Sequence, residues 1–145
     1  MTGISQASAR AAAVEFVTDY AVSMDVKLQV YPARPRTLYP PTAFVDRIRE
    51  TDTVLAGLTF QRTITVDVLI VHGLFDSNDA AIQKDAFVDG MYQWVIGREH
   101  TAGANSLIRI AGTEDLPDWV PEWIPPGEQR TYYATEITLE GFGTN

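Results

Sequence analysis

The sequence of 145 residues contains no cysteine. This absence excludes a disulfide scaffold, thiolate metal sites and a cysteine nucleophile, and it suits a reducing compartment without proving one. Long apolar runs are also missing, and none approaches the length of a membrane span. The N-terminus carries an Arg and a Glu where a signal peptide needs an apolar region. We therefore expect no membrane partner and a mature chain that begins near Met1.

Basic residues are scarce, since 11 Lys and Arg stand against 19 Asp and Glu, for a net charge of -8. Binding to phosphates needs Lys and Arg concentrated on one surface, so nucleic acid is an unfavourable partner for tight binding. The charge is also uneven, because residues 51–145 hold five basic and fourteen acidic groups. This pattern predicts an acidic face or end, although a surface that merely keeps the protein soluble is an equal alternative.

Recognisable catalytic motifs are absent as well: the chain has two histidines and no nucleophile elbow, phosphate-binding loop, dinucleotide fingerprint or zinc-protease helix. Asp85 and Asp89 are spaced to share one side of a helix, and His72 lies near Asp76 just before it. A metal site there is conceivable, but acidic residues on a solvated helical face are the common case. We expect no catalytic residue, metal or cofactor, and therefore not an enzyme.

Periodicity predicts an α+β fold with two helices packed on a mainly antiparallel β-sheet, joined by Pro-rich extended loops, in one domain over residues 1–145. The helices are expected over residues 5–24 and from about residue 77 to 96. The clearest strand is Leu58–Ile70, where apolar and polar residues alternate. Further strands are expected near residues 26–31, 42–50, 106–112 and 130–143. Gly90 inside the second helix costs about 1 kcal/mol relative to Ala, so we expect a close contact with the sheet there.

Two Pro-rich segments interrupt this pattern, "PARPRTLYPP" (residues 32–41) and "DLPDWVPEWIPPGEQR" (residues 115–130). Proline lacks the N–H that helices and central strands need, so both segments are predicted to be loops or arms. Trp119 and Trp123 carry large apolar surfaces that something should cover. They either clasp a partner or fold back over their own sheet edge as a lid, and we favour the clasp.

The order of elements resembles a known family. An N-terminal helix precedes the strand "VYP" and a Pro-rich stretch, and "TVDVLIVHGLFDSNDAAIQKDAFVDGMYQWV" runs from a strand through an acidic turn into a helix, before the terminal strand "TYYATEITLEGFG". This pattern, over nearly the whole chain, resembles the tail terminator (tail completion) proteins of long-tailed bacteriophages, a family without an invariant motif. A head–tail stopper or adaptor of the same neck looks alike at this level, and a small metal-dependent enzyme is the remaining alternative.

The resemblance implies a structural virion protein that is assembled in the host cytoplasm. It would form a homohexameric ring in the neck, stop growth of the tail tube and offer a surface to the head–tail connector or stopper protein. Pro-rich segments lose little entropy on docking, and Trp is enriched among interface anchors. The residues we expect to bind partners are Trp119, Pro121, Trp123, Arg34 and Arg36.

A ring also gives the acidic excess a meaning. Six copies at -8 would carry about -48, so an acidic bore would let DNA pass through without specific binding. The carboxylates that are candidates to face the lumen are Asp46, Glu50, Asp67, Glu136 and Glu140. That they face the outer solvent instead is an equal alternative.

Overall fold

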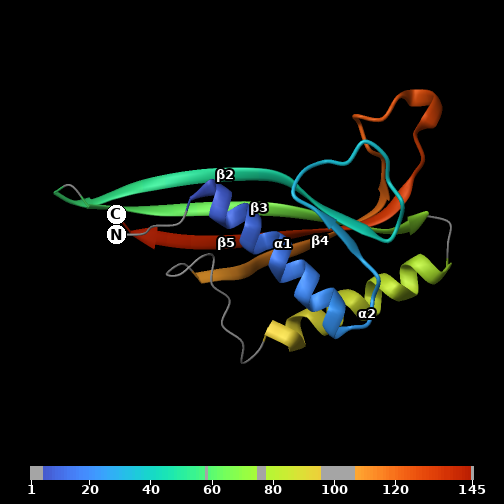
Figure 1. Ribbon diagram of the computed structural model, residues 1–145, viewed down its shortest axis with the longest axis horizontal. Helices are drawn as coiled ribbons and strands as arrows, with labels where there is room; N and C mark the ends of the chain where they lie inside the picture. Colours follow the sequence, from blue (N-terminus) through green and yellow to red (C-terminus); the bar gives the residue numbers. More distant parts are fainter. Residues whose placement is uncertain (1–4, 58, 75–77, 96–106, 145) are drawn as a thin grey trace.

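The computed structural model describes residues 5–57, 59–74, 78–95 and 107–144, and within them a five-stranded sheet carries two helices (Figure 1). The strand order is β1-β2-β3-β5-β4, with β1 parallel to β2 and all other neighbours antiparallel. The elements are α1 (Gln6–Ser23), β1 (Gln29–Tyr31), β2 (Thr42–Ala56), β3 (Thr59–Leu74), α2 (Asn78–Val95), β4 (Leu107–Trp119), the short 3₁₀ helix η1 (Pro126–Glu128) and β5 (Tyr132–Thr144). The predicted α+β class is confirmed.

The central strand β3 follows the predicted alternation. Ile64, Val66 and Val68 are buried on the face that carries the helices. The strand runs four residues beyond the predicted end at Ile70, and Leu58 lies outside the described residues. Leu69 and Val71 are also buried, in a second cluster on the opposite face. The sheet is therefore covered on both sides at one end.

Helix α1 begins at a capping box, in which Ser5 and Ser8 bond reciprocally to each other's backbone N–H groups. Its buried residues recur at three- and four-residue spacing and pack on the sheet; they are Ala9, Ala12, Ala13, Phe16, Val17, Tyr20 and Ala21. The helix was expected to extend to residue 24, but it ends at Ser23, and Met24 is the C-cap residue at 37% exposure.

Gly90 makes a close contact, but its neighbour is α1 rather than the sheet. A Cβ at this position would lie 2.6 Å from the Tyr20 hydroxyl oxygen and 3.0 Å from the terminal methyl carbon of Met24. The Tyr20 hydroxyl donates a hydrogen bond to the Phe87 carbonyl, and the two rings meet edge to face at 4.6 Å. The small residue in α2 therefore lets the two helices approach each other.

Residues 115–119 were expected in a loop, but they extend β4. Leu116 pairs with Ala134 and Trp119 with Tyr132, with a register shift between the two pairs. Pro117 lies within that shift, on a strand at the edge of the sheet, where its missing N–H interrupts no essential ladder bond. The irregular arm begins only after Trp119.

Candidate interaction surfaces

The two Pro-rich segments meet on the face of the sheet opposite the helices. We call residues 32–41 and 120–131 the arms, and they lie side by side at one end of the sheet, coloured cyan and orange in Figure 1. Beneath them is an apolar group that we call the arm cluster: Leu38, Phe44, Leu69, Val71, Ile124, Tyr132 and Ala134, with Tyr31, Leu116, Trp119 and Trp123 packed against it. The arms thus build a second small core.

Trp123 ties the two arms together. Its indole N–H donates to the Pro35 carbonyl at 2.8 Å, and its ring meets Phe44 edge to face at 5.4 Å. Trp119 lies 5.7 Å from it and also contacts Phe44. The carbonyls of the second arm accept hydrogen bonds from the Gln129 side chain, which closes the loop. Within their own chain, the two tryptophans therefore fold back over the sheet, as the lid alternative predicted.

The expected partner-binding residues only partly share one surface. Trp119, Trp123 and Arg34 line a groove of about 400 Å³, in which the Arg34 guanidinium lies 4.9 Å above the Trp123 ring. Pro121 is buried, and Arg36 is exposed on the first arm but does not line this groove. Both tryptophans are only half-buried, so contact with a partner in addition to the lid packing stays a prediction.

Beyond the arms, the same face of the sheet is polar and uncovered by any described element. We call this region the open face, and it comprises Arg47 and Arg49 of β2, Thr65 and Asp67 of β3, Glu136, Thr138 and Glu140 of β5, and Glu114 of β4. Side chains alternate along a strand, and Asp67 is two residues before the arm-cluster residue Leu69. Its register partners Arg47 and Thr138 project from the same side.

Asp67 is the most buried carboxylate of the open face, at 1% exposure. Its oxygens accept hydrogen bonds from Arg47 Nε at 3.0 Å, Arg49 Nη2 at 3.1 Å and Thr138 Oγ1 at 3.1 Å. A buried carboxylate is stable only when paired in this way. Two arginines therefore pair with Asp67, and its orientation toward a lumen stays a prediction.

Glu136 differs, because acidic groups surround it. Burial raises its pKa, and the negative charges of Asp67, Glu114 and Asp46 raise it further, while Arg47 opposes them. Glu114 lies directly opposite Glu136 in the β4·β5 register. Like charges at such a position destabilise a sheet. Neither glutamate forms an ion pair within the described residues.

The remaining lumen candidates divide between the two faces. Asp46 forms an ion pair with Arg34 at 2.8 Å beside the arms. Glu50 lies on the helix side, where it accepts a hydrogen bond from Gln6 of α1 and pairs with Arg62. The five carboxylates therefore do not form one acidic wall, and Glu50 is separated from the others by the sheet itself.

The residues of the metal-site alternative are not brought together. His72 donates to or accepts from Thr135 Oγ1 at 3.0 Å, and burial is the main cause that lowers its pKa to about 4, with the charge of Lys84 adding to it. Asp85 pairs instead with Lys84 at 2.7 Å on the exposed side of α2. Asp76 lies outside the described residues, and no group of three His, Cys, Asp or Glu in the described ranges could hold a metal ion.

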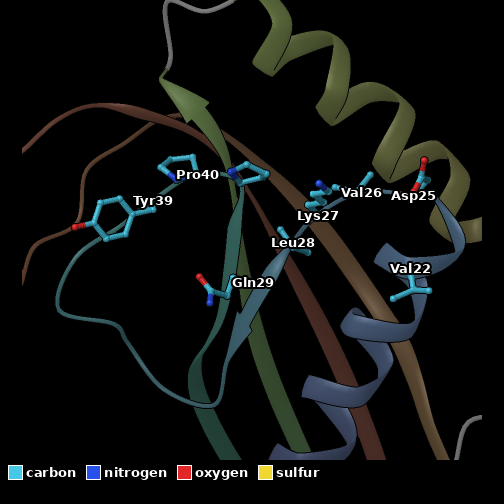
Figure 2. A pocket seen from close by; sticks show the side chains of 9 residues that line it. Val22, Asp25, Val26, Lys27, Leu28, Gln29, Tyr39 and Pro40 are labelled. Atoms are coloured by element: carbon cyan, nitrogen blue, oxygen red, sulfur yellow. The ribbon is translucent and has the colours of Figure 1, made fainter.

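An additional pocket, not predicted from the sequence, lies between the end of α1 and the first arm (Figure 2). Its volume is about 660 Å³, and its walls include Val22, Lys27, Leu28 and Tyr39. Val22 is 72% exposed and Tyr39 is 73% exposed. The pocket is thus a shallow surface hollow with both polar and apolar walls, and not an enclosed ligand cavity.

Comparison with protein-family models finds no match for this chain, and comparison with curated proteins finds no relative. Neither of the described helices is long and apolar enough to cross a membrane.

Proposed function

We propose that this chain is a structural virion protein, a tail terminator that forms a ring on the tail tube of a long-tailed bacteriophage and joins the tube to the head connector. Its proposed partners are five further copies of itself in a ring of six, by analogy with the family, together with the tube protein and the connector. It would assemble in the host cytoplasm and reside in the neck of the virion.

The observation that carries the proposal is the unequal covering of the two sheet faces. Both helices pack on one face, the arms cover one end of the other, and the open face carries polar and charged side chains. A ring that encloses DNA needs an inner surface of this kind. Its outer side is supported by packed helices, and its inner side is polar and faces the solvent of the bore. The chain's net charge of -8, together with the partial neutralisation of Arg47 and Arg49 by Asp67, would disfavour the adhesion of phosphates.

The arms offer a second surface, suited to the tube or the connector. Half-buried Trp119 and Trp123 border a groove, and the neighbouring Val120 is 37% exposed. Anchors of this kind give protein interfaces most of their binding energy. The arms are already folded on their own sheet, so little ordering entropy would be lost on docking.

The test is growth of tail tubes in vitro, with the tube protein encoded in the same phage genome. Addition of this protein should stop elongation, and labelled protein should lie at one tube end. Val120→Asp should weaken this capping, whereas Ile82→Asp, at a 66% exposed position on α2, should not. Binding to the connector alone would favour the stopper or adaptor role, and binding to neither would defeat the proposal.

A further inference from the structure

The two lateral edges of the sheet carry long stretches of unpaired backbone. The short strand β1 pairs only with residues 42–44 of β2, so the outer edge of β2 from residue 45 to 56 has no partner strand among the described residues. On the opposite side β4 pairs with β5 alone within the described part of the chain. Exposed edges of this length are templates for pairing with another chain.

The open face is electrically polarised between these two edges. At the β2 edge, Arg47 and Arg49 are 60% and 51% exposed and share the single carboxylate of Asp67, which leaves one positive charge in excess. At the β4 edge, Glu114 and Glu136 face each other without an ion pair among the described residues. Within the described part of the chain, the β2 edge therefore lacks an anion, and Glu114 on the β4 edge lacks a cation, because the basic residue of β4, Arg109, is in register with Glu140 instead.

We propose that β4 of one copy pairs with β2 of the next, so that Arg47 and Arg49 of one subunit lie beside Glu114 and Glu136 of its neighbour. The occupant of each edge is a second copy of this chain. The inference rests on the proposed ring and names its subunit contact. It also accounts for the cost of placing two glutamates opposite each other, since the neighbour's arginines would neutralise them.

Charge selects this pairing over the symmetric ones, and the strand directions are compatible with it. Pairing β2 with β2 would bring arginines together, and pairing β4 with β4 would bring Glu114 of each copy together. Three successive antiparallel steps make β4 antiparallel to β2 within one subunit. Rotation about an axis along the strands preserves these directions, so the new ladder is antiparallel, like most of the sheet. A contact between unlike edges is heterologous, and it closes into a ring when the rotation from one copy to the next divides a full turn.

The test uses single charge reversals that should leave the subunit folded. Arg49→Glu keeps the ion pair between Arg47 and Asp67, and Glu114→Arg removes the repulsion between Glu114 and Glu136. Each variant alone should sediment as a 16.1 kDa monomer where the wild type is a multimer. An equimolar mixture should reassemble, because every junction between unlike variants then pairs opposite charges. Glu15→Arg, the same change on the exposed side of α1, is the matched control and should assemble normally.

Cross-linking provides a second measurement, since the chain has no cysteine. A variant with Arg49→Cys and Glu114→Cys, treated with a bismaleimide, should give a ladder of multimers, whereas Ile82→Cys with Glu114→Cys should not. The edge pairing would be overturned if the wild type is a multimer, Glu114→Arg leaves that multimer intact, and the Arg49→Cys and Glu114→Cys variant gives no ladder of cross-linked multimers. The ring proposal would survive that outcome. A wild type that stays monomeric at all concentrations would overturn both.

Discussion

Replacement of Trp123 by Ala tests whether the arms belong to the folded subunit. The substitution removes the edge-to-face contact with Phe44 and the 2.8 Å hydrogen bond to the Pro35 carbonyl. Truncation of a fully buried Trp costs about 3–5 kcal/mol, and a net hydrogen bond contributes about 1 kcal/mol. Because Trp123 is only half-buried, we expect the total to lie near the low end, at about 3 kcal/mol.

A thermal melt followed by circular dichroism measures this loss. For a chain of this size, about 3 kcal/mol corresponds to a fall in Tm of about 6–12 °C. Trp123→Phe is the matched control, since it keeps a ring against Phe44 and loses only the N–H donor. Its Tm should fall by about a third as much as that of the Ala variant. An Ala variant that melts like the wild type, yet no longer caps tubes, would refute the lid packing and support a clasp on a partner.

Three further predictions follow from the core, the buried histidine and the charge. Val66→Asp should prevent folding because it buries an unpaired charge at a fully buried position, whereas Thr65→Asp on the open face should still fold; equal circular dichroism spectra would show that the strand register is wrong. Because burial lowers the pKa of His72 to about 4 from 6.5, the unfolded chain binds its proton first, so stability should decline by up to about 1.4 kcal/mol per pH unit as pH falls from about 6.5 to 4. His72→Gln should remove that part of the slope in urea titrations at several pH values. The purified protein should bind no duplex DNA at physiological salt, and salt-sensitive binding in the micromolar range would contradict this.

Periodicity predicted the helix-bearing face well, because burial on one side leaves a regular pattern in the sequence. The alternation along residues 58–70 predicted one buried face, and Ile64, Val66 and Val68 are buried there. The arm cluster was not predicted, because it joins segments that are far apart in the sequence. Its signal was present, since residues 68–71 form a continuous apolar run, which indicates a strand covered on both faces.

The candidate site was predicted less well, because the face a side chain occupies depends on strand register and bulges. The register shift between Val45 and Arg47 offsets the alternation along β2, so spacing alone could not place Glu50 on the helix side. The pairing of Asp67 with Arg47 and Arg49 depends on which strands are neighbours. Composition could predict the acidic excess. It could not predict that exposed arginines lie on β2 while two glutamates face each other on β4 and β5.

The most direct test of the ring is electron cryo-microscopy of the protein bound to a tail tube end. The account predicts a closed ring of identical subunits, with both helices outside, the open face toward the bore, and Arg49 of each subunit beside Glu114 of the next. A ring with the helices toward the bore, or protein bound at the tube end without a closed ring, would contradict it.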